Sequence, residues 1–79
     1  MQSEPERLLG MQNLADMLEK HVDDHDLNNV LEALSMMCFE KAGHVLQYTD
    51  SAHLSKAWET MGQTLFEASH KATQLGFGE

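Results

Sequence analysis

Two histidines four residues apart are the first candidates for a metal site in this sequence. Imidazoles at positions i and i+4 of one helix can hold zinc or nickel, and His21 and His25 have that spacing. The acidic segment from Asp23 to Asp26 predicts a break between them, and the sequence fixes no third ligand. We expect no bound metal: His21 and His25 are the candidate ligands, and the alternative is a solvated acidic turn.

The segment around His53 offers a second chemistry, phosphoryl transfer. Lys56 follows His53 at the third position, an arrangement that resembles the phosphorylated histidine of histidine-phosphotransfer bundles, which are also acidic and helical. Bulky Trp58 departs from that pattern, and His53 falls in the first turn of a predicted helix rather than in its middle. We interpret His53 as an exposed histidine at a helix start, with phosphotransfer as the alternative.

The remaining reactive side chains have simpler interpretations. Cys38 falls in the apolar arc of a predicted helix, which indicates a buried, inert thiol, although nearby Lys41 could activate it. Glu67 and His70 have the Glu-x-x-His spacing of di-iron bundles but lie opposite the apolar seam, so we expect both at the surface. Phosphate-loop, nucleophile-elbow and His-Glu-x-x-His motifs are all missing from the sequence. We therefore predict a non-enzymatic protein without cofactors.

The charge balance restricts the partners. The 79 residues include 13 acids against 5 lysines and arginines, a net charge of −8. Such a surface repels nucleic acids and anionic membranes, so it favours basic protein partners or serves solubility alone. A single cysteine excludes a disulfide within the chain and fits a reducing compartment. The sequence has no apolar run of about 20 residues and no secretory signal, so we expect a cytoplasmic protein.

The composition predicts one all-α domain over residues 1–79. Isoleucine is absent and valine is sparse, whereas good helix formers dominate. The first helix should span residues 4–22, with Ser3 as its N-cap, Glu6 completing a capping box and Pro5 in the first turn. Its apolar seam is narrow and comprises Leu8, Met11, Ala15, Leu18 and Val22.

The second helix should span residues 27–47 and be capped by Asp24 or Asp26. Its apolar residues cover about 200° of its circumference at 100° per residue, so we expect neighbours on two sides. Lys41 falls inside this arc. Either its stem passes the core and its ammonium group reaches water, or it pairs with an acid from another helix or subunit.

The third helix should span residues 51–75, capped by Thr49 or Asp50 at its start and by Gly76, with Phe77 folding back, at its end. It carries a heptad seam of Leu54, Trp58, Met61, Leu65, Ala68, Ala72 and Leu75. Beside it, Ser55, Gly62 and Ser69 recur every seven residues. These small residues either let another backbone approach closely or are ordinary flank positions.

These helices expose more apolar surface than one short chain can bury. We expect the second and third helices to form an antiparallel hairpin that pairs with a second hairpin, a homodimer with a four-helix core and the first helix on its flank. The predicted interface residues are Phe39, Leu46, Leu54, Trp58, Met61, Leu65 and Phe66.

Residues 27–58 resemble a pattern of small uncharacterised bacterial all-α proteins. It reads Leu-x-x-Val-Leu-x-x-Leu-x-x-x-Cys-x-x-Lys-Ala-x-His from Leu27 to His44, continues with Tyr48 and Asp50, and ends in Lys-Ala-Trp at 56–58. Tyr48 replaces a more usual tryptophan. The resemblance implies a bacterial origin and no known function. We expect a self-associating helical module that binds another protein; the alternative is a small metal-binding or histidine-phosphotransfer protein.

Overall fold

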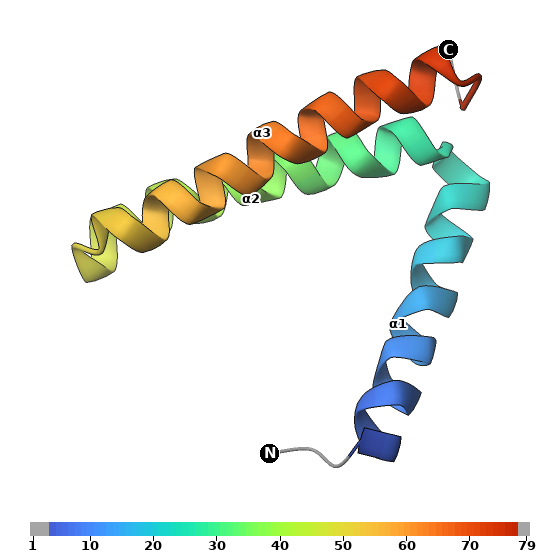
Figure 1. Ribbon diagram of the computed structural model, residues 1–79, viewed down its shortest axis with the longest axis horizontal. Helices are drawn as coiled ribbons and strands as arrows, with labels where there is room; N and C mark the ends of the chain where they lie inside the picture. Colours follow the sequence, from blue (N-terminus) through green and yellow to red (C-terminus); the bar gives the residue numbers. More distant parts are fainter. Residues whose placement is uncertain (1–3, 78–79) are drawn as a thin grey trace.

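The computed structural model describes residues 4–77 and confirms the all-α prediction. Its three helices are α1 (Glu4–His25), α2 (Leu27–Thr49) and α3 (Ala52–Gln74), and no strand occurs in this range. Helices α2 and α3 lie side by side as an antiparallel hairpin, whereas α1 projects from one end of it (Figure 1). Pro5 occupies the first turn of α1 as predicted, and the predicted N-cap Ser3 lies outside the described residues.

The turn between α1 and α2 is a single residue. The predicted break from Asp23 to Asp26 is confirmed at Asp26 alone, because α1 continues through Asp23 and Asp24 to His25. An aspartate lowers helix propensity by only about 0.7 kcal/mol, too little to end an otherwise continuous helix. Asp26 makes the turn with φ 71° and ψ 152°, and its side chain does not cap α2. Residues other than glycine rarely adopt this backbone conformation, which costs about 1–3 kcal/mol.

The turn between α2 and α3 differs from the predicted one in its capping residue. Asp50 adopts the left-handed conformation, at φ 54°, and the hydroxyl of Ser51 accepts a hydrogen bond from the Leu54 N–H at 3.2 Å. The prediction of Thr49 or Asp50 as the cap was wrong by one residue. The hydroxyl of Thr49 instead donates to the Val45 carbonyl oxygen at 2.6 Å.

Helix α3 ends as predicted. The Phe77 N–H donates to the Ala72 carbonyl oxygen at 2.9 Å, and the Gly76 N–H donates to Thr73 at 3.1 Å. Gly76 has φ 100°, which glycine adopts without steric cost. These two hydrogen bonds define a Schellman motif.

The two helices of the hairpin pack through small residues. Apart from Asn28 of α2, the buried positions are Ser35, Cys38 and Ala42 on α2 and Ser55, Gly62, Ser69 and Ala72 on α3. We call this set the small-residue seam. Of the two interpretations of the repeat in α3, close approach is therefore correct. Of the predicted heptad residues, Ala72 belongs to the seam, whereas the large ones lie beside it: Leu54, Met61 and Leu75 are exposed, and Trp58 and Leu65 are half-buried.

Hydrogen bonds across the small-residue seam tie the two backbones together. The Ser35 hydroxyl donates to the Gly62 carbonyl oxygen at 2.6 Å, and the Ser55 hydroxyl donates to that of Ala42 at 2.8 Å. A Cβ atom on Gly62 would lie 3.1 Å from the ring of Phe39, which leaves no ordinary van der Waals space. Each hydroxyl reaches the opposite main chain only because no bulky side chain holds the helices apart.

Helix α1 is an arm with little contact to the rest of the chain. None of its described residues is buried, and no Cα atom of Glu4–His25 lies within 8 Å of one in α3. It meets α2 only near the turn that joins them (Figure 1). The radius of gyration is 15.0 Å, against about 12 Å for a compact domain of this length. The first helix therefore does not cover the hairpin of its own chain.

Candidate protein-interaction surface

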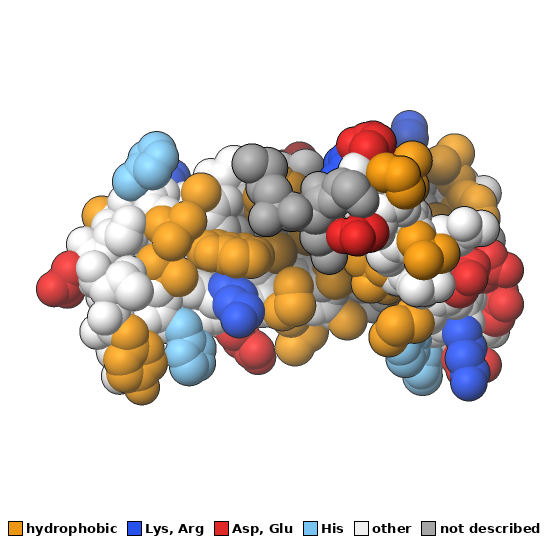
Figure 2. All heavy atoms as spheres, turned by 90° about the horizontal axis from the view of Figure 1, so that it is seen from below, with side chains coloured by type: hydrophobic (Ala, Val, Ile, Leu, Met, Phe, Trp, Pro, Cys, Tyr) orange, Lys and Arg blue, Asp and Glu red, His pale blue; other side chains and the backbone are white. Residues whose placement is uncertain are grey.

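The hairpin has two faces of different character. At 100° per residue, one side of the small-residue seam presents Val30, Leu34 and Met37 from α2 and Leu54, Trp58, Met61 and Leu65 from α3. We call these seven residues the apolar face. Leu54, Ala57, Trp58 and Met61 line a shallow apolar depression of about 220 Å³ on it. Hydrophobic side chains gather along the hairpin on the side toward which α1 projects (Figure 2).

The opposite face of the hairpin is mixed. Phe39 shares a depression of about 250 Å³ with charged and amide side chains of α3, among them Lys56, Glu59 and Gln63. Its ring covers the small-residue seam above Gly62. Phe66 packs edge-on against His70, with 4.6 Å between ring centroids. Both phenylalanine rings thus already contact other residues of their own chain.

The structure therefore divides the predicted interface residues into groups. Leu54, Trp58, Met61 and Leu65 lie together on the apolar face, whereas Phe39 and Phe66 lie on the opposite face. Leu46 is exposed in the last turns of α2, near the α2–α3 turn. A single flat partner surface can contact the first group at once, but not both groups.

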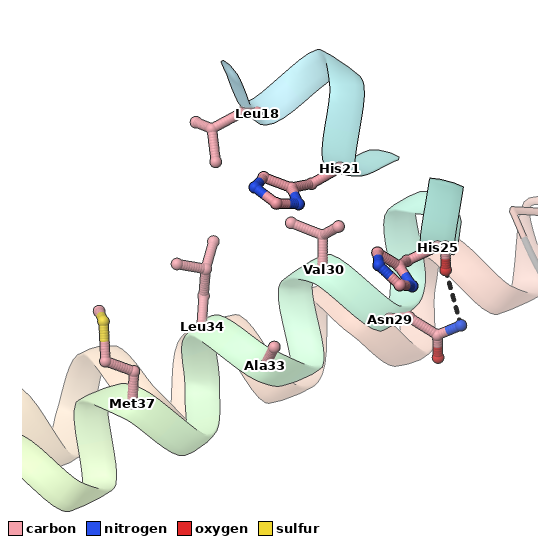
Figure 3. A pocket seen from close by; sticks show the side chains of 8 residues that line it. All are labelled: Leu18, His21, His25, Asn29, Val30, Ala33, Leu34 and Met37. Atoms are coloured by element: carbon pink, nitrogen blue, oxygen red, sulfur yellow. Dashed lines mark hydrogen bonds between the residues drawn. The ribbon is translucent and has the colours of Figure 1, made fainter. Parts of the chain in front are cut away.

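A groove opens where the arm leaves the hairpin. It measures about 550 Å³ and is lined by Leu18, His21, His25, Asn29, Val30, Ala33, Leu34 and Met37. Figure 3 shows Leu18 and His21 of α1 pointing toward Val30 and Leu34 of α2. The groove continues the apolar face into the angle between arm and hairpin. The groove was not predicted from the sequence, although the wide apolar arc of α2 indicated a second neighbour for that helix.

The histidine pair lies on this groove. Because α1 runs through His25, the two imidazoles occupy successive turns of one helix, contrary to the predicted break. Their rings stack with 6.4 Å between centroids and 19° between planes. The Asn29 side-chain amide donates to the His25 carbonyl oxygen at 2.7 Å. Within residues 4–77, no group of three or more His, Cys, Asp and Glu side chains is placed to hold one metal ion.

The other reactive candidates are not gathered into a site. His53 is exposed in the first turn of α3, and the Lys56 ammonium lies 3.7 Å from the Glu59 carboxylate. Cys38 is buried in the small-residue seam. Lys41 is exposed and borders a depression with Glu40 and His44, which agrees with an ammonium group in water rather than in the core. Glu67 and His70 are exposed, as predicted.

Comparisons with known proteins do not indicate a function, so the proposal below is argued from the surface of the molecule. None of the described helices is both long and apolar enough to cross a lipid bilayer. No protein-family model, curated protein or solved structure matches this chain significantly.

Proposed function

We propose that this chain is a non-enzymatic, self-associating helical module whose apolar face binds the same face of a second copy. The observation that supports this most directly is the exposure of that face, in which the large side chains of Leu54 and Met61 are 46% and 50% exposed. Pairing two hairpins through it produces the four-helix core expected from the sequence.

The surface area of the chain supports the same proposal. The chain exposes 6342 Å², whereas a monomeric protein of 8.9 kDa exposes about 4,800 Å². The excess of about 1,500 Å² per chain falls within the range that obligate homodimers bury. A second copy is therefore a partner of sufficient size.

The charge distribution fits association through the apolar face. All seven of its residues are uncharged, and Lys41 is the one charged residue on the same side of α2 by the same count of 100° per residue, while the chain as a whole carries −8. Two copies repel one another electrostatically, so the driving force must be apolar burial. The acidic surface that remains outside such a dimer is suited to a basic protein partner, which we propose as the second level of recognition.

The test is the molar mass and dissociation constant in solution. Sedimentation equilibrium should give twice 8.9 kDa, and added salt should tighten the dimer because it screens like charges. Met61→Glu should weaken the dimer about 30-fold, since it removes a buried methionine and desolvates a carboxylate. Met36→Glu is the matched control, because Met36 is 60% exposed against 50% for Met61 but lies off the apolar face.

Two results would contradict the proposal. A wild-type mass of one chain at micromolar concentration would remove self-association altogether. Equal dissociation constants for Met61→Glu and Met36→Glu would place the interface elsewhere on the molecule.

A metal-binding function is the second candidate, supported by the stacked pair of His21 and His25. Two imidazoles on successive helix turns can chelate one zinc or nickel ion. Zinc titration followed by calorimetry should then show one site per chain that His21→Ala abolishes and His53→Ala leaves unchanged. A titration without heat would eliminate this candidate.

A further inference from the structure

We propose that in this dimer the arms are exchanged, so that α1 of each copy packs against the hairpin of the other copy. The inference rests on the self-association proposed above and identifies what occupies the angle between arm and hairpin. The occupant is the partner's hairpin, and the contacting stripe of the arm is Met11, Leu14 and Leu18.

The arm presents its apolar stripe to the correct side. Leu18 points into the groove beside Val30 and Leu34 (Figure 3). Met11 and Leu14 lie seven and four residues before Leu18, so they share its side of the helix. All three are exposed in the single chain. The stripe therefore faces the same open angle as the apolar face of the hairpin.

Leu18 lines the groove with α2 of its own chain, but Met11 and Leu14, farther along the arm, stay exposed. Helix α1 is about 33 Å long at 1.5 Å per residue. None of its Cα atoms lies within 8 Å of a Cα atom in α3. It projects on the side of the hairpin where hydrophobic side chains gather (Figures 1 and 2). A second hairpin bound to the apolar face lies on that side too, within reach of the arm.

The exposed area leaves room for the arm in the interface. The excess of about 1,500 Å² per chain is larger than the area of about 800 Å² per partner in a standard interface and falls in the range of obligate homodimers. The arm exposes six large apolar side chains, Leu8, Leu9, Met11, Leu14, Met17 and Leu18, so its docking can contribute to an interface of that size. The groove of about 550 Å³ is large enough for one or two bulky side chains of the partner.

The turn at Asp26 provides an independent argument. A non-glycine residue with φ 71° and ψ 152° is retained only where the surrounding structure holds it. Within the single chain, the Asp26 N–H donates to the Val22 carbonyl oxygen at 2.8 Å and the Asp26 carbonyl oxygen accepts from the Val30 N–H at 3.2 Å, but beyond this turn the arm has few contacts with α2. Docking of the arm on a second copy would add a further restraint on the conformation of the turn.

Isotope-filtered NMR on the full chain tests the exchange directly. A dimer refolded from equal amounts of ¹³C-labelled and unlabelled chain should show NOEs from the Met11 and Leu14 methyls of one copy to hairpin protons of the other. Trp58, the only tryptophan, supplies a resolved indole reporter on the apolar face. Arm contacts found only within one chain, or no arm contacts, would overturn the proposal.

A pair of variants supplies a second measurement. Leu14→Glu should weaken the dimer about 30-fold through loss of apolar burial, whereas Leu9→Glu should leave the dissociation constant within about twofold, as exposed substitutions usually do. Leu9 is 61% exposed against 48% for Leu14 but lies on the other side of α1. If Leu14→Glu has no effect while Met61→Glu disrupts the dimer, only the exchange fails. A monomeric wild type would instead remove the proposed function.

Discussion

The arm and the first helix of the hairpin contain equal numbers of leucines and methionines, but only one of them buries any residue. Helices α1 and α2 each contain four leucines and two methionines, yet only α2 buries residues. The residues that α2 buries are small or polar, and they include Asn28, Ser35 and Ala42 at intervals of seven. Burial within this chain thus follows a repeat of small side chains, which α1 lacks, rather than the number of large apolar ones.

This difference has a geometric cause. Packing through small residues brings two helices close together, and at such short separation a serine hydroxyl can reach the opposite carbonyl group, as in the 2.6 Å bond from Ser35 to Gly62. Large side chains are displaced to the flanks of the contact. The hairpin consequently keeps its largest apolar residues, such as Met61 and Leu54, at its surface.

Among substitutions that test this difference between hairpin and arm, enlarging Gly62 should have the largest effect on stability. Gly62→Val should reduce the free energy of unfolding by about 3 kcal/mol, because the new side chain collides with Phe39 at a position where a Cβ already lies 3.1 Å from the ring. Urea unfolding at a fixed protein concentration measures it.

The arm supplies the control for this substitution. Gly10→Ala meets nothing within 4 Å and should raise stability by up to about 1 kcal/mol through helix propensity alone. Equal destabilisation by Gly62→Val and Gly10→Ala would mean that the close contact between α2 and α3 is not the basis of hairpin stability.

A smaller effect is expected from removing one hydroxyl of the small-residue seam. Ser35→Ala should cost about 1 kcal/mol, because the buried hydrogen bond to the Gly62 carbonyl oxygen is lost. Thr64→Ala, which removes an exposed hydroxyl bonded within α3, should change stability by less than about 0.5 kcal/mol. Both are measured by urea unfolding, and a larger loss from Thr64→Ala would refute the role of the seam.

The two turns should differ when each aspartate is replaced by glycine. Asp26→Gly should raise stability by up to about 1 kcal/mol, because it relieves the strained turn at the base of the arm while adding entropy to the unfolded chain. Asp50→Gly should have an effect near zero, since φ 54° is a conformation that aspartate tolerates. Thermal unfolding of both variants measures the two changes in stability. An equal gain at both positions would show that the backbone at Asp26 is no more strained than the backbone at Asp50.

Several features of the fold were predictable because they depend on neighbouring residues. The three helices follow from local propensity and apolar periodicity, and the end of α3 follows from Gly76 and Phe77. The break at Asp23 and Asp24 was predicted wrongly because a weak local preference was overruled by the continuing helix. The cap of α3 was likewise predicted one residue early from local preferences, whereas it is the Ser51 hydroxyl that accepts the hydrogen bond from the Leu54 N–H.

The sequence by itself determined that this protein is helical, where its helices approximately lie and which residues could make an interface. Only the tertiary structure decided that Ser55, Gly62 and Ser69 face α2, that Leu54 and Met61 are left outside, and that Phe39 and Phe66 lie on the opposite face. The physical reason is that a heptad of small residues and a heptad of large ones fit the same helix equally well. Which of them faces inward depends on the distance between two helices, and that distance arises only when both are in place.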